Sequence, residues 1–188
     1  MPEPRVKGVA FRTVDQCFLE LRGAEAQKRA RALMPPELAD NYQRGLVLAS
    51  SWYPISWYRQ VFAAFLKATG DGPELARQIG YRSMQLDMKS VYKQVFARFV
   101  SPQTMLTMSN RLFNSYYDTA RATVIDPSHG HVRMLLTQCI GWDLNMFTEI
   151  QGSATALLEI AGAKQVRQQL LSGGRDGDTE MELEAHWI

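Results

Sequence analysis

The sequence lacks most of the patterns by which catalytic and metal-binding proteins are recognised. It contains two cysteines, Cys17 and Cys139, which lie in apolar stretches without the CxxC spacing of zinc and redox sites. GxSxG, HExxH and paired-carboxylate patterns are also missing. We therefore expect two buried thiols, a reducing compartment and no catalytic residues, so the protein is predicted not to be an enzyme.

Neither a charge of one sign nor a long apolar segment stands out. The chain carries 21 Lys and Arg residues against 19 Asp and Glu residues, which gives a formal net charge of +2. Such a balance favours neither nucleic acid nor an anionic membrane surface as a partner. No run reaches the roughly 18 apolar residues of a membrane span, and the N-terminus lacks the apolar core of a signal peptide. These absences predict a cytoplasmic protein that binds no nucleic acid and has no membrane span.

Histidine is scarce, with three residues in the whole chain. His129 and His131 have the spacing that places two side chains on one side of a strand, as a metal site requires. No third ligand is evident near them, and residues 126–130 read Asp-Pro-Ser-His-Gly, which is ordinary turn chemistry. His186 is expected to point outward from the final strand. We therefore predict solvent-exposed histidines, no metal ligand and no cofactor.

Residues 119–188 show the clearest structural pattern, two predicted β-hairpins with one helix between them. In the final strand Met181 and Leu183 alternate with Glu182 and Glu184, which is the period of a strand with one buried face. The glycine-rich loop before this strand lies between two strands, whereas a phosphate loop precedes a helix, so we interpret it as a hairpin loop. The pattern predicts a ββαββ unit that forms a four-stranded antiparallel sheet.

Helical patterns fill the preceding residues and the stretch between the two hairpins. A helix that starts at Pro73 is expected to end at Gly80, and a longer helix is expected over residues 83–99. The helix between the hairpins contains four small residues that are predicted to let it approach the sheet closely: Gly152, Ser153, Ala154 and Ala156.

A chain of 188 residues is long enough for one well-buried core. We therefore predict a single α+β domain over residues 1–188. Its helical N-terminal part, residues 1–118, is expected to pack on the four-stranded antiparallel sheet of the ββαββ part, residues 119–188.

The predicted helices carry many aromatic and thioether side chains on their apolar faces. Methionine adapts its shape, so such a set suits a pocket for an apolar molecule, a surface for a protein partner, or core packing alone. If the protein is a homodimer, exposed parts of the same helices are expected to form the contact. The residues predicted to bind a ligand are Trp57, Phe62, Met84, Met88, Phe96 and Met105.

Several short motifs occur in order along nearly the whole chain. They are Val6-Lys7-Gly8, Ser51-Trp52-Tyr53-Pro54, Gly72-Pro73-Glu74-Leu75-Ala76-Arg77, Tyr116-Tyr117-Asp118-Thr119, Gly141-Trp142 and a Glu-rich strand that ends at Trp187. This set resembles an uncharacterised paralogous family expanded in myxobacteria. The motifs are structural and not catalytic, so the resemblance implies a fold more than an activity.

The order of helices and ββαββ unit is also similar in topology to the superfamily of haem-nitric-oxide sensors, four-vinyl-reductase domains and TRAPP vesicle-tethering subunits. This resemblance implies an α+β domain that holds an apolar ligand between helices and sheet, or that dimerises through helices. The Tyr-x-Ser-x-Arg motif of the haem sensors is not matched, because residues 81–85 read Tyr-Arg-Ser-Met-Gln and the helical part lacks histidine. The resemblance therefore does not extend to haem binding.

Taken together, these features predict a non-enzymatic regulatory or sensory module that binds an apolar small molecule in a pocket between helices and sheet. The alternative is a homodimeric scaffold or adaptor for protein–protein interaction that holds no ligand. The two differ in a measurable way. A ligand-binding module gains thermal stability from its ligand, whereas the stability of a dimeric scaffold depends on protein concentration.

Overall fold

The computed structural model describes residues 2–90 and 102–188, and for residues 89, 90 and 103–109 it describes the backbone alone. Its first part contains β1 (Arg5–Lys7), α1 (Gly8–Leu33), α2 (Pro36–Gln43), β2 (Trp52–Pro54), α3 (Ile55–Thr69), α4 (Glu74–Ser90) and α6 (Pro102–Tyr116). The second part contains β3 (Arg121–Ser128), β4 (His131–Thr137), α7 (Leu144–Ile160), β5 (Arg167–Gly173) and β6 (Met181–His186). The predicted α+β fold is confirmed, with a mainly helical first part and a ββαββ second part.

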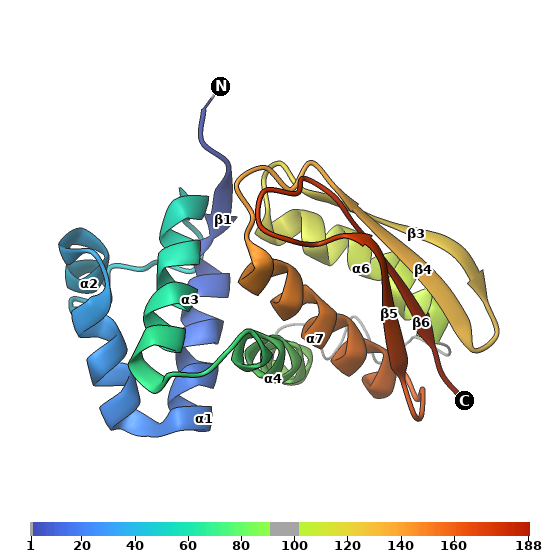
Figure 1. The fold of residues 1–188 in the computed structure, drawn as a ribbon, viewed down its shortest axis with the longest axis horizontal. Helices are drawn as coiled ribbons and strands as arrows, with labels where there is room; N and C mark the ends of the chain where they lie inside the picture. The colour runs from blue at the N-terminus through green and yellow to red at the C-terminus, as the bar shows by residue number, and fades with distance from the viewer. Residues whose placement is uncertain (1, 91–101) are drawn as a thin grey trace.

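Figure 1 shows three layers along the long axis of the molecule. The helices α1, α2 and α3 lie on one side, the sheet of β3, β4, β5 and β6 lies on the other, and α4 and α7 lie between them. In the N-terminal layer, α1 packs against α3 through stacked rings of Phe18 and Phe65, whose centroids are 4.0 Å apart. Among the described residues, no helix combines the length and the apolarity that a membrane crossing requires.

The sheet has the strand order β3-β4-β6-β5, with all neighbours antiparallel. Alternation in β6 is as predicted, because Met181 and Leu183 are buried and Glu182 and Glu184 lie on the opposite face. In the pairing of β4 with β6, Met134 lies opposite Leu183, so both apolar side chains face the helices. A register shift of one residue would bury the glutamates instead, which is why this register is strongly preferred.

Helix α7 begins where the sequence supplies a capping side chain. The Asp143 carboxylate accepts a hydrogen bond from the backbone N–H of Met146 at 3.0 Å, which satisfies one of the free donors of the first turn. The apolar side chains of α7 then cover the inner face of the sheet, where Leu157 and Leu158 pack with Val132 and Ala185.

The central layer depends on a close contact between the backbones of α4 and α7. A Cβ atom on Gly80 would lie 1.9 Å from the carbonyl oxygen of Glu149, and one on Gly152 would lie 2.0 Å from that of Arg77. Two sequence predictions are wrong here. Gly80 lies inside α4 and does not end a helix, and Gly152 and Ser153 let α7 approach α4, not the sheet. Glycine is a poor helix former, but at both positions only its missing side chain permits this distance.

We expect Gly80→Ala and Gly152→Ala each to lower the free energy of unfolding by about 1–3 kcal/mol or more, because the added methyl group overlaps a backbone carbonyl that cannot move alone. Urea denaturation of the purified variants measures this loss. Gly72→Ala is the matched control, since a Cβ there meets no atom within 4 Å. Equal stability of Gly80→Ala and Gly72→Ala would contradict the close helix contact.

Candidate functional site

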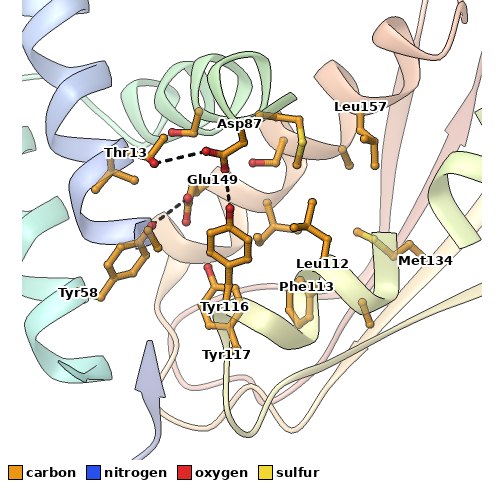
Figure 2. Close-up of a pocket in the computed structure, with 18 residues that line it drawn as sticks. Thr13, Tyr58, Asp87, Leu112, Phe113, Tyr116, Tyr117, Met134, Glu149 and Leu157 are labelled. Carbon is orange, nitrogen blue, oxygen red and sulfur yellow. Dashed lines mark hydrogen bonds between the residues drawn. The ribbon is translucent and has the colours of Figure 1, made fainter. Parts of the chain in front are cut away.

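A mostly apolar cavity of about 90 Å³ lies where α1, α4, α6 and α7 meet the inner face of the sheet (Figure 2). The residues that line it come from both parts of the chain. They are Ala10, Thr13, Val14, Tyr58, Ser83, Met84, Asp87, Leu112, Phe113, Tyr116, Tyr117, Ala122, Met134, Glu149, Ile150, Ser153, Ala154 and Leu157.

Helical spacing explains which side chains reach the cavity. On α7 the lining residues recur at steps of three and four, which is the period of one helix face, and they include Glu149, Ser153 and Leu157. Small side chains such as Ala10 and Ala154 leave the space that larger residues would fill. The cavity therefore exists because short side chains stand on the facing elements, while the α4–α7 contact holds the walls in place.

Glu149 is the most unusual residue of the cavity wall. Its side chain is buried in a mostly apolar region, with 6% of the residue's surface exposed. The hydroxyl of Tyr58 donates a hydrogen bond to Oε1 at 3.0 Å, whereas Oε2 has no hydrogen-bond partner among the described residues. Burial raises the pKa of Glu149 to about 8, although the hydrogen bond from Tyr58 acts in the opposite direction. At neutral pH the carboxyl group therefore carries a proton, and Oε2 can donate it to a hydrogen bond.

A second carboxyl group, Asp87 on α4, lies on the same cavity wall (Figure 2). It accepts a hydrogen bond from the hydroxyl of Tyr116 at 2.7 Å, and the Thr13 hydroxyl lies 3.5 Å from its other oxygen. Burial raises the pKa of Asp87, and these two hydroxyls oppose the shift. Two acids with raised pKa values that line one apolar cavity mark it as a candidate functional site.

No activated nucleophile accompanies these acids among the described residues. Ser83 lines the cavity with its hydroxyl 3.4 Å from the Sγ atom of Cys17, and no described residue of the cavity wall is a histidine, lysine or arginine that could act as its base. Burial raises the pKa of the Cys17 thiol to about 11 and that of Cys139 to about 12, so both remain protonated and unreactive. Burial also raises the pKa of Tyr58 and Tyr117 well above their ordinary value. The described residues of the cavity wall can accept and donate hydrogen bonds.

The structure places the residues predicted to bind a ligand in different surroundings. Met84 lines the cavity, whereas Met88 is buried in the neighbouring cluster beside Leu157. Phe62 is fully buried in the main core, and Trp57 stacks on Tyr53 at a ring distance of 5.9 Å, so neither faces the cavity. Phe96 lies outside the described residues, and so does the side chain of Met105.

The two acids of the cavity were not predicted as site residues, although the sequence contains a pattern that indicates them. Glu149 follows the buried Met146 by three residues on α7, and Asp87 follows Met84 by three residues on α4. A carboxylate at a position where the helical period calls for an apolar side chain is a sign of a buried acid. Both acids are therefore visible in the sequence, as charged residues on otherwise apolar helix faces.

Comparison with known proteins identifies the fold. No protein-family model matches the chain, and a comparison with curated proteins gives no match. Among solved structures, the unliganded Fe(II) H-NOX protein from K. algicida has a TM-score of 0.76 and 14% sequence identity, with 97% of this chain and 96% of that chain covered. An oxygen-binding H-NOX domain related to soluble guanylate cyclases has a TM-score of 0.72 and 13% identity, over 96% of this chain and 94% of that chain.

A mutant of T. tengcongensis H-NOX gives a similar result, with a TM-score of 0.68, 13% identity, and 96% of this chain and 97% of that chain covered. At such identities the likeness shows the fold and nothing finer. The topological similarity to haem-nitric-oxide sensors that the sequence suggested is confirmed at this level. The chain therefore has an H-NOX-like fold over nearly its full length.

The raised pKa of Glu149 predicts how stability depends on pH. Between its ordinary value of 4.5 and its folded-state value of about 8, the folded protein holds a proton that the unfolded chain releases. The free energy of unfolding contributed by this group therefore falls as pH rises through that window. We expect Glu149→Gln to remove this fall, so that its stability relative to the unmodified protein rises by on the order of a few kcal/mol from pH 5 to pH 8.

Urea unfolding curves at several pH values measure this difference. Glu159→Gln, on an exposed position of the same helix, is the control and should follow the unmodified protein. If the curves of Glu149→Gln and Glu159→Gln ran parallel over the whole range, the buried acid would not be protonated as described.

Proposed function

We propose that this protein is a non-enzymatic sensory or regulatory module that binds a small apolar molecule in the cavity between its helices and its sheet. The observation that carries the proposal is the cavity itself. It is apolar, it is walled by both parts of the chain, and it contains one buried acid, Glu149, with an oxygen that lacks a partner among the described residues. An unsatisfied buried oxygen costs free energy, and a ligand atom that hydrogen-bonds to it would remove that cost.

The size of the cavity limits the ligand. Pockets for drug-sized molecules are roughly 300–1,000 Å³, whereas an engineered apolar cavity of about 150 Å³ holds benzene or xenon. A volume of about 90 Å³ therefore suits a molecule no larger than one small ring. Because the protonated Glu149 offers a hydrogen-bond donor beside an apolar wall, the best ligand is apolar with a single acceptor atom.

Haem is the group that the similar structures suggest, because their names refer to haem, porphyrin and oxygen. The cavity residues of this chain do not fit it. The three histidines stand on β4, on β6 and in the β3–β4 turn, and none of them lines the cavity. Haem carries two anionic propionates, yet the described residues of the lining include no Lys or Arg and do include two acids, Asp87 and Glu149. A macrocycle would also exceed the cavity volume, so the proposed ligand is a different and smaller molecule.

A ligand at this position would contact all three layers of the molecule at once. Thr13 and Tyr58 stand on the N-terminal layer, Glu149 on the central layer and Met134 on the sheet. Filling the cavity would add contacts to all of these layers, and a ligand that binds one arrangement of them more tightly than another shifts the population toward that arrangement. This is the physical basis on which binding could be passed on to a partner.

We expect the purified protein to bind xenon and small aromatic molecules such as benzene and phenol. A saturable change in the ¹²⁹Xe chemical shift and a rise in melting temperature with benzene or phenol would report binding. At a ligand concentration of 100 times the dissociation constant, the free energy of unfolding should rise by about 2.7 kcal/mol. Phenol should bind more tightly than benzene, because its oxygen can accept a hydrogen bond from Glu149.

The matched variants are Ala154→Leu, which fills the cavity, and Ala154→Ser, which adds one oxygen atom. We expect Ala154→Leu to lose xenon and benzene binding while Ala154→Ser keeps it. Stability that is unchanged by every probe, together with a constant dimer mass in native mass spectrometry, would instead favour the homodimeric scaffold.

A further inference from the structure

Two histidines and one glutamate meet on the outer face of the sheet, away from the cavity. His131 is the first residue of β4 and His186 is the last residue of β6, and the register of these strands places them opposite each other. Glu184 lies two residues before His186, on the same face of β6. The cavity is lined from the other face of the same strands, for example by Met134.

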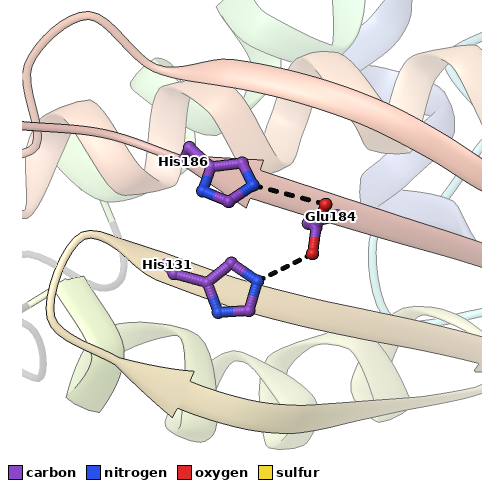
Figure 3. A group of neighbouring side chains, drawn as sticks. All are labelled: His131, Glu184 and His186. Carbon is purple, nitrogen blue, oxygen red and sulfur yellow. Dashed lines mark hydrogen bonds and ion pairs between the residues drawn. The ribbon is translucent and has the colours of Figure 1, made fainter.

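The three side chains converge on a small volume (Figure 3). Nε2 of His131 is 2.8 Å from Oε1 of Glu184, and Nε2 of His186 is 3.3 Å from its Oε2. One ligand atom from each residue can be chosen so that all three lie within 4.8 Å of one another. Zinc bonds of about 2.0–2.2 Å in a tetrahedron separate neighbouring ligand atoms by about 3.3–3.6 Å, so small side-chain rotations would bring this group into a coordinating arrangement.

The sequence drew attention to a different pair, His129 and His131. In the structure, His131 lies beside His186 and not in a cluster with His129. His186 is far from His131 along the chain and is brought next to it because β4 pairs with β6. Its third ligand, Glu184, was also hidden because it belongs to β6 and not to the turn. A side chain from each of two paired strands, and a second one from β6, give a more rigid set than residues of a single loop.

The surroundings of the cluster suit a cation. Arg133, which stands opposite Glu184, is already engaged with Glu182 and lies 3.6 Å from Asp126, so its charge is balanced. The Oγ atom of Ser128 is 3.5 Å from Nδ1 of His131, on the side of the ring opposite Nε2. A partner on the second ring nitrogen orients a metal-binding histidine and leaves the other nitrogen free to coordinate.

We propose that His131, Glu184 and His186 form a surface site for a divalent transition-metal ion, with zinc as its best-suited occupant. Two imidazoles and one carboxylate are ligands that zinc accepts, whereas calcium and magnesium prefer a shell of oxygen atoms. Three protein ligands leave a fourth position for water or for a ligand from a partner. His186 is more exposed than the other two, with 56% of its side chain accessible, which gives an ion a path to the site.

The test is calorimetric titration of the full chain with zinc chloride after removal of metal with EDTA and dialysis. We expect one zinc ion per chain. His131→Ala, His186→Ala and Glu184→Gln should each weaken binding about tenfold or more, since changes even outside the ligand shell cost that much at metal sites. His129→Ala is the matched control, because His129 lies in the same hairpin but outside the cluster, and it should bind zinc as the unmodified protein does.

Cobalt provides a second readout, because a tetrahedral cobalt site with nitrogen and oxygen ligands absorbs visible light and an unbound ion in water absorbs only weakly. The unmodified protein and His129→Ala should show this band, and the double variant His131→Ala/His186→Ala should not. Circular dichroism in EDTA verifies that each variant is folded. The proposal is overturned if the unmodified protein takes up no zinc, or if the folded double variant binds zinc as tightly as the unmodified protein.

Discussion

The contact between the backbones of α4 and α7 at Gly80 and Gly152 is the constraint on which the rest of this structure depends. It sets how near α4 lies to the sheet, because α7 is between them (Figure 1). Ser83 and Asp87 follow Gly80 by one and two turns, and Ser153 follows Gly152 directly. The contact between the two helices therefore sets the distance between these cavity-lining residues. A side chain at either glycine would separate the helices and change the shape of the cavity.

Burial of Glu149 lowers the stability of this arrangement. An ionised carboxylate in such a position would lose most of its hydration, so the group remains protonated and accepts one hydrogen bond from Tyr58. An apolar residue of similar size would pack there without the oxygen that, among the described residues, has no partner. A polar group that lowers stability at the wall of a cavity, with a second acid at Asp87, is more easily explained by binding than by folding.

Local patterns were sufficient for the fold, but not for the site. The alternation of Met181 and Leu183 with the glutamates predicted a strand with one buried face, because the period of two is a property of neighbouring residues. The hydrogen bond of Tyr58 to Glu149 joins residues 91 positions apart, and no periodicity within one element reports such a pair. Likewise, Gly80 was predicted to end a helix. The structure shows instead that this position requires glycine because the backbone of α7 lies against it.

This chain shares its fold with the H-NOX structures at 13–14% identity over nearly its full length. The arrangement of helices and strands can therefore be separated from the properties that individual side chains determine. Helical spacing and strand alternation reproduce the layers with different residues, because packing requires apolar character and volume more than identity. Binding has stricter requirements. A haem needs an axial ligand and partners for its propionates, whereas the described lining of this cavity offers two acids and three tyrosines around a volume of about 90 Å³. The shared fold supplies a place between helices and sheet, and the residues at that place decide its occupant.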